Sequence, residues 1–96
     1  MIEGAFSLTQ KAIVDLRSIR YWYEQQQEGL GSEFFKEVAA VLNRAQKNPL
    51  IFTFINQNVR RCKPRKFPHY IYFSHKNGIV VLRVRHIKQK PLKRFT

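Results

Sequence analysis

Two alternating runs of residues around Asn77-Gly78 constrain the fold of this chain more than any other feature. The segment KFPHYIYFSHKNGIVVLRVRHIK, residues 66–88, surrounds a dipeptide that favours the positive backbone angles of a tight hairpin turn. Alternation of period two assigns successive side chains to opposite faces of a sheet. In the first strand, one face is expected to carry Ile71, Phe73 and His75 and the other Tyr70, Tyr72 and Ser74. In the second strand, one face is expected to carry Val80, Leu82, Val84 and His86 and the other Ile79, Val81, Arg83 and Arg85. We expect the Val80 row to face the core.

The first half of the chain predicts two helices after a short strand at residues 6–8. Thr9 is a good N-cap for a helix that continues toward Gln27, and Ser32 can cap a second helix that ends before Pro49. The apolar faces expected for the two helices are Ala12, Leu16, Ile19 and Tyr23, then Phe34, Phe35, Val38, Val41, Leu42 and Ala45. Two helices joined by so short a connection form a helical hairpin that needs a sheet to cover.

The sheet comes mainly from the second half. A strand at residues 59–63, interrupted by Pro64, precedes the two hairpin strands. The predicted order is therefore β-α-α-β-β-β. We expect an α+β fold, a helical hairpin packed on a mainly antiparallel sheet of about four strands. At 96 residues the chain fits one domain, residues 1–96, with a short basic tail at 88–96.

The net charge of +12 is distributed unevenly along the chain. All six acidic residues precede residue 38, whereas twelve Lys and Arg residues follow Asn58 without a single carboxylate. Such a one-signed surface attracts a polyanion or an acidic protein, and mixed signs would serve solubility better. We therefore expect a partner that neutralises the C-terminal half.

Several chemical classes have no support in the sequence. The lone Cys62 and three dispersed histidines form no metal-site spacing, and no glycine-rich phosphate loop is present. We expect no metal and no cofactor. No secretory signal and no apolar stretch of about 20 residues occurs, so we expect a cytoplasmic protein.

Metal-free RNA cleavage remains conceivable, because it needs a base, an acid and cations for the phosphate. The candidate residues are His86, Arg83, Arg85, Arg60 and Arg61. In a regular strand, however, Arg83 and Arg85 point away from His86, so a joint site requires a bulge. We lean toward a binding protein rather than an enzyme, with His86 as an ordinary residue at the end of the core row.

Two binding surfaces are also suggested. Tyr70 and Tyr72 beside many cations could form a nucleic-acid surface, although alternating aromatic residues also occur in ordinary strands. Val14, Tyr21 and Trp22 lie off the apolar stripe of the first helix and form a candidate protein-binding face. A basic nucleic-acid-binding module without toxicity is thus one alternative.

The order of motifs resembles the RelE and ParE superfamily of toxins from bacterial type II toxin-antitoxin systems. The resemblance rests on FSLTQKAIVDLRSI, GLGSEFFKEVAAVLNRAQKNP, VRRCKPRKFPHYIYF and IVVLRVRHIKQKP, which together cover nearly the whole chain. The match is closer to ParE, in which Arg60-Arg61, the segment at residues 67–72 and the ending at residues 84–91 have counterparts. His69 replaces an expected tyrosine, and Tyr70 stands where the ribonucleases of the RelE branch carry an arginine.

This resemblance implies a plasmid-stabilising, growth-inhibiting toxin that inhibits DNA gyrase when ParE-like, or cuts mRNA on the ribosome when RelE-like. It also implies a cognate antitoxin whose acidic C-terminal segment folds over the toxin, which agrees with the charge distribution. The residues expected to bind the antitoxin or the target are Arg60, Arg61, Tyr70, Tyr72, Arg83, Arg85, Lys88, Val14, Tyr21 and Trp22.

Overall fold

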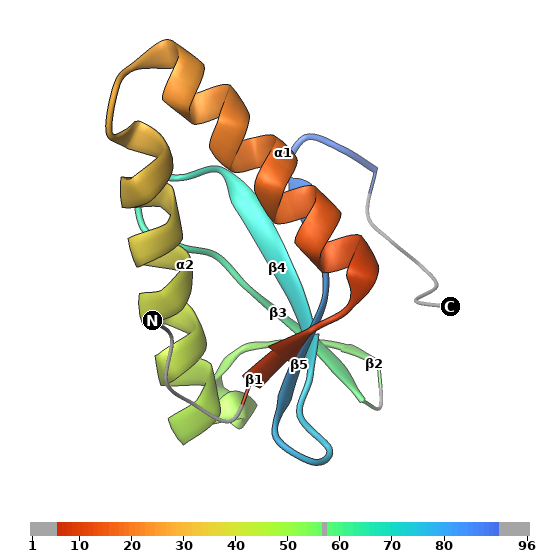
Figure 1. The fold of residues 1–96 in the computed structure, drawn as a ribbon. Coiled ribbons are helices and arrows are strands. Elements are labelled where there is room, and N and C mark those ends of the chain that lie inside the picture. Colours follow the sequence, from red (N-terminus) through yellow and green to blue (C-terminus); the bar gives the residue numbers. More distant parts are fainter. Residues whose placement is uncertain (1–5, 57, 91–96) are drawn as a thin grey trace.

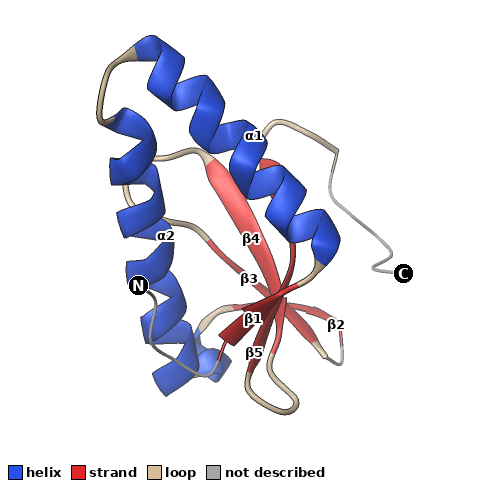
Figure 2. Cartoon of the chain, in the orientation of Figure 1, coloured by secondary structure: helices blue, strands red, loops and turns tan. Residues whose placement is uncertain are grey.

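Two helices cover one face of a five-stranded sheet (Figures 1 and 2). The computed structural model of the chain describes residues 6–56 and 58–90. Its elements are β1 Phe6–Leu8, α1 Gln10–Gln26, α2 Leu30–Lys47, a 3-10 turn Pro49–Ile51, β2 Thr53–Asn56, β3 Val59–Cys62, β4 His69–Ser74 and β5 Ile79–His86. The predicted α+β class and the helical hairpin on a mainly antiparallel sheet are confirmed.

The sheet has one strand more than the predicted four. Its order is β1-β5-β4-β3-β2, with β1 parallel to β5 and the other neighbours antiparallel. The additional strand, β2, follows directly after the turn at Pro49 and has only four residues. So short a run shows no clear alternation, which is why the sequence pattern did not reveal it.

Thr9 starts α1 as predicted and also fastens the helix to the sheet. Its Oγ1 accepts a hydrogen bond from the backbone N–H of Ala12 at 3.1 Å and donates one to the carbonyl of Leu82 at 2.8 Å. Its backbone N–H donates to the carbonyl of Val81 at 3.0 Å. One threonine therefore satisfies a helix N-terminus and fixes where α1 crosses β5.

The predicted start of α2 at Ser32 is wrong. Gly29 is the N-cap, in the left-handed conformation with φ 86°, and the helix begins at Leu30. The missing side-chain cap is supplied by Glu24 of α1, whose carboxylate accepts from the backbone N–H groups of Gly29 at 2.9 Å and Gly31 at 3.0 Å. A Cβ on Gly31 would lie 2.8 Å from the carbonyl oxygen of Arg20, so this glycine permits the close approach of the helices.

The β4–β5 connection differs from a two-residue hairpin turn. The strands end at Ser74 and resume at Ile79, and only Gly78 of the Asn77-Gly78 pair has a positive φ, 86°. A type I′ turn requires positive φ at both central residues. The glycine therefore serves a four-residue loop rather than the tight turn that the dipeptide suggested.

A register shift in β5 changes its predicted core row. Phe73 pairs with Val81 and Tyr72 with Arg83, so Leu82 is an extra residue between two pairs. The buried residues of β5 are Ile79, Val81 and Val84, whereas Val80 and Leu82 are only partly buried. The prediction was thus right for Val84 and wrong for the first half of the strand.

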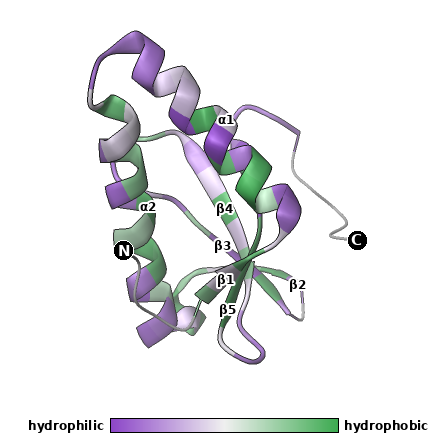
Figure 3. Cartoon of the chain, viewed as in Figure 1, coloured by the Kyte–Doolittle hydropathy of each residue, from purple (hydrophilic) through white to green (hydrophobic). Residues whose placement is uncertain are grey.

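The core lies between the helices and the sheet, where Figure 3 shows hydrophobic residues along the facing sides of α2 and β5. Phe34, Ile71, Phe73 and Val81 are completely or almost completely buried there. Phe35, which we expected on the inner face of α2, is 38% exposed, and the Arg20 guanidinium lies 5.3 Å from its ring.

The described helices contain no segment long and apolar enough to span a bilayer. Of the predicted basic tail, residues 91–96 lie outside the described part.

Candidate functional site

The outer face of the sheet, opposite the helices, carries a cationic and aromatic group from three strands. Cross-strand partners share a face, and the pairs here are Arg61 with Tyr72 and Tyr70 with Arg85. The Arg61 guanidinium lies 3.9 Å from the centre of the Tyr70 ring, a close cation–π contact. We call Arg61, Tyr70 and Arg85 the outer basic face.

The two arginines of the outer basic face have no carboxylate counter-ion in the described part of the chain. Their Nε atoms are inaccessible to solvent and make no hydrogen bond to the described residues. Neither side chain forms an ion pair within residues 6–56 and 58–90. With no carboxylate beside them among the described residues, the two guanidinium groups suit an anionic partner.

Tyr72 does not contribute a ring to this face. It is 2% exposed, although it pairs with Arg61 and belongs to the outward row. The Tyr70 ring is 6.5 Å from it, edge to face, and only Tyr70 stays partly accessible. Of the two tyrosines expected to offer rings for base stacking, only Tyr70 is accessible. A surface with one accessible ring is less typical of nucleic-acid stacking than the expected pair.

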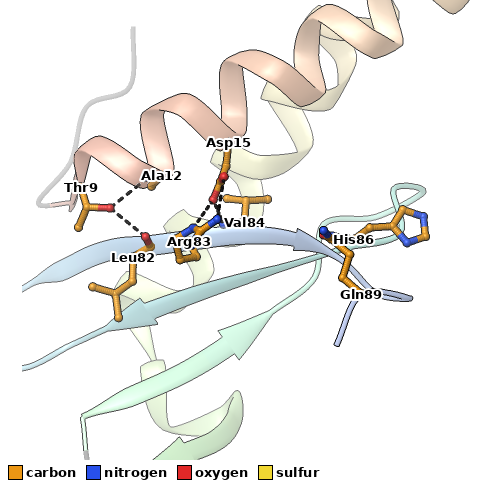
Figure 4. Close-up of polar contacts among 8 residues, drawn as sticks. All are labelled: Thr9, Ala12, Asp15, Leu82, Arg83, Val84, His86 and Gln89. Atoms are coloured by element: carbon orange, nitrogen blue, oxygen red, sulfur yellow. Dashed lines mark hydrogen bonds and ion pairs between the residues drawn. The ribbon is translucent and has the colours of Figure 1, made fainter. Parts of the chain in front are cut away.

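Arg83, two residues before Arg85, is already neutralised within the molecule. Its Nε donates to Oδ2 of Asp15 at 2.8 Å and its Nη2 donates to Oδ1 at 3.3 Å. The same Oδ2 accepts from the backbone N–H of Val84 at 2.9 Å, so one carboxylate of α1 clamps β5 (Figure 4). The hydrogen bond that Arg83 donates to Asp15 raises the pKa of Arg83. Arg83 therefore belongs to the structure of the α1–β5 contact.

A groove runs between α1 and the ends of β4 and β5. One part, with a volume of about 530 Å³, is lined by Ser18, Ile19, Trp22, Tyr23, Pro68, His69 and His86. The adjoining part, of about 560 Å³, shares Ser18, Ile19 and both histidines and adds Asp15, Arg83, Val84, Arg85 and Gln89. This α1–β5 groove thus has an apolar, aromatic half and a cationic half, and Arg85 connects it to the outer basic face.

Two histidines from neighbouring strands lie at the junction of the two halves. The His69 and His86 rings are 5.2 Å apart, edge to face, and His69 is 6% exposed. Burial, with the charges of His86 and Lys63 nearby, lowers the pKa of His69 to about 4, so its ring is neutral near pH 7. The Nδ1 atom of His86 accepts from the backbone N–H of Lys88 at 3.0 Å, and Oε1 of Gln89 accepts from the His86 N–H at 2.8 Å.

The remaining predicted site residues are spread over other surfaces. Arg60 pairs with Phe73 and so lies on the helix side of the sheet, where its Nη1 donates to the carbonyl of Phe52 at 2.9 Å. Lys88 is exposed in the turn after β5. Val14 and Tyr21 are 52% and 67% exposed on α1 away from the groove, whereas Trp22, 56% exposed, lines it. The structure therefore brings together Arg61, Tyr70 and Arg85, and joins Trp22 to Arg85 and His86 through the groove.

Sequence reasoning missed Asp15 and His69. Asp15 is the single carboxylate of the described residues that ion-pairs with a cation of the sheet strands, and its place one turn after Ala12 on α1 was the available signal. His69 was noted only as a replacement for tyrosine. Its strand position, two residues before Ile71 in the inward row, predicts burial by period-two alternation.

The described residues offer no obvious centre for metal or thiol chemistry. No group of three or more His, Cys, Asp or Glu side chains among them could hold a metal ion. Burial raises the pKa of the Cys62 thiol to about 12, which keeps it protonated and unreactive near neutral pH.

Comparison with known proteins gives one family and one fold. Residues 6–91 match the model of the ParE toxin of the type II toxin-antitoxin system parDE. Among solved structures, a chain from the chromosomal ParDE toxin-antitoxin system of P. aeruginosa superposes with a TM-score of 0.70 at 18% sequence identity, over 90% of this chain and 98% of the other. No curated protein matches the chain.

Proposed function

The chain belongs to the ParE family of toxins from type II toxin-antitoxin systems, and from this premise we propose that it inhibits DNA gyrase and is neutralised by a cognate antitoxin. The observation that carries the proposal is the family match over residues 6–91. The unpaired arginines of the outer basic face supply a surface for the antitoxin.

The antitoxin contact follows from charge and accessibility. Carboxylates on an extended or helical segment can satisfy Arg61 and Arg85 from outside, since no described acid of the toxin does so. The α1–β5 groove offers the same segment an apolar site beside Trp22 and Ile19. Charge-assisted bonds at the arginines and apolar burial in the groove together provide both register and affinity.

The test has a cellular and a biochemical part. Controlled expression of the chain should arrest growth, and co-expression of the neighbouring open reading frame should relieve the arrest. Purified toxin should block supercoiling by gyrase and accumulate gyrase-linked DNA breaks. Normal supercoiling at saturating toxin would refute the gyrase assignment while leaving the toxin class intact.

The antitoxin surface is tested separately with matched charge changes. Arg61→Gln and Arg85→Gln together should weaken antitoxin binding by at least about tenfold, because two charge-assisted contacts are lost. The control combines Arg17→Gln and Lys36→Gln, which also remove two charges, from the exposed faces of α1 and α2, and it should leave affinity within about twofold. Equal loss in both variants would mean that only overall charge matters.

Ribosome-dependent mRNA cleavage is the second candidate function, and one observation favours it. Arg83, Arg85 and His86 line the same part of the α1–β5 groove, although residues 83–86 pair with β4 in regular register. Two contacts argue against mRNA cleavage. The Arg83 guanidinium already donates to the Asp15 carboxylate, and Nδ1 of His86 already accepts from the backbone N–H of Lys88. Cuts in translated mRNA that disappear in His86→Ala would establish this function, and their absence from the intact protein would eliminate it.

A further inference from the structure

Strand β2 forms an edge of the sheet that neither helix covers. It is the last strand in the order β1-β5-β4-β3-β2, pairs with β3, and projects away from α1 and α2 (Figure 1). Three of its four residues are exposed. An edge strand presents a row of backbone N–H and C=O groups that can pair with another chain, and proteins usually block such edges with Lys or Pro. The TFIN sequence of β2 contains neither.

Large apolar side chains are exposed along the same stretch of chain. Leu50, Ile51 and Phe54 are 64%, 60% and 58% exposed, within five consecutive positions. Phe54 pairs with Arg60, which pairs with Phe73, so its ring lies on the helix side of the sheet at a corner that the helices leave open. Contiguous exposed apolar residues with a polar rim are typical of interaction sites.

The rim of this corner is cationic. The Arg60 guanidinium lies 5.4 Å from the centre of the Phe54 ring, and that of Arg44 lies 5.7 Å from the Phe52 ring. Lys47 ends α2 just before the 3-10 turn, and no acidic residue occurs in the sequence after Glu37. A partner that covers the apolar residues must therefore bring carboxylates to the rim.

We propose that residues 50–54, with Arg44 and Arg60, form a docking surface for an extended, acidic segment of a protein partner. The segment adds its backbone to the edge of β2 and places apolar side chains on Ile51 and Phe54, with carboxylates toward the two arginines. The register shift after Phe54 keeps the backbone pairing short, so the side chains supply most of the affinity. A second copy of the chain fits less well, because a symmetric contact would bring the same cations together.

This surface is distinct from the outer basic face, on the opposite side of the sheet, and the inference does not depend on the gyrase assignment. Its test uses the purified full chain and a short blocked peptide that alternates glutamate with valine and phenylalanine. Two control peptides carry lysine in place of glutamate, or a central proline that removes a backbone donor. Binding is measured by titration, and its location by hydrogen exchange of the backbone amides.

The acidic peptide should bind and slow exchange in residues 53–56, and not at the other edge in residues 6–8. Phe54→Ser should weaken binding by at least about fivefold, whereas Ile87→Ser, an exposed apolar residue after β5, should leave it within about twofold. The lysine and proline peptides should bind more weakly than the acidic one. No binding, equal binding of the lysine peptide, protection away from β2, or self-association that Phe54→Ser abolishes would overturn the proposal.

Discussion

Arg83 and Arg85 are two residues apart on β5 and carry the same charge, yet they lie in contrasting regions of the molecule. At the α1–β5 contact, Arg83 is held by Asp15, which also accepts from the Val84 backbone. On the outer basic face, Arg85 and Arg61 have no carboxylate among the described residues. The difference separates cations that hold the fold together from cations left for a partner. Charge counted along the sequence cannot make this distinction.

The largest effect on stability is expected from Asp15→Ala. This substitution leaves the Arg83 charge and the Val84 N–H without their shared acceptor, at a site where both side chains are less than a third exposed. Removing one partner of a partly buried, hydrogen-bonded pair should lower the free energy of unfolding by about 3 kcal/mol. Urea denaturation measures the change. Asp15→Asn keeps one acceptor and should lose less; a loss below about 0.5 kcal/mol in Asp15→Ala would show that the contact is not structural.

An intermediate effect is expected from acid at His69, next to the groove. The pKa of His69 is lowered to about 4 in the folded chain from an ordinary value of 6.5, so the unfolded chain binds the extra proton between these values. The contribution of His69 to stability is therefore fully present above about pH 6.5 and is lost as the pH falls toward 4, with a loss of about 2 kcal/mol already at about pH 5.

Unfolding followed over this pH range measures the loss. His69→Phe removes the titrating group and should flatten that part of the profile, while His75→Gln, a control on the same strand's end, should not. If the stability of His69→Phe depended on pH in the same way as that of the unaltered chain, His69 would not be the group that titrates.

The smallest effect on stability is expected on the outer basic face. Arg85→Gln should change the free energy of unfolding by less than about 0.5 kcal/mol, because no ion pair among the described residues is lost and one charge of a +12 chain is removed. Arg61→Gln should lower it by at most about 1 kcal/mol, because it also loses the cation–π contact with Tyr70. Arg83→Gln is the matched comparison and should lower the free energy of unfolding clearly more, because it leaves the Asp15 carboxylate without its cationic partner. Equal losses in all three variants would erase the distinction between the two regions.

The elements predicted from sequence were those with strong local signals. Thr9 capped α1, the stripe from Ala12 to Tyr23 packed inward, and the hairpin strands formed around Gly78. The errors have specific physical causes. The helix α2 begins before the predicted cap Ser32, because the carboxylate of Glu24 on α1 accepts from the backbone N–H groups of Gly29 and Gly31 and so caps the helix there. Strand β2 was missed because pairing with β3 defines it, with little help from its own sequence.

The candidate site was predicted only in composition. Arg61, Tyr70, Arg85 and Trp22 were named from charge and residue type, but their grouping depends on strand pairing and on where α1 crosses β5. Tyr72 was placed in the correct row and is nevertheless buried. Alternation specifies the face of a side chain, whereas its accessibility depends on the neighbours that cover it.

By itself the sequence determined the fold class, the family resemblance and an excess of positive charge that the chain's own acids cannot balance. Local propensities and period-two or helical patterning act between neighbouring residues, so they can be read along one dimension. Only the tertiary structure decided that Asp15 neutralises Arg83, that Arg61 and Arg85 have no carboxylate partner within residues 6–56 and 58–90, and that β2 presents an open edge. Those outcomes depend on contacts between residues far apart in the chain, such as 15 and 83, which close only when the helices pack on the sheet.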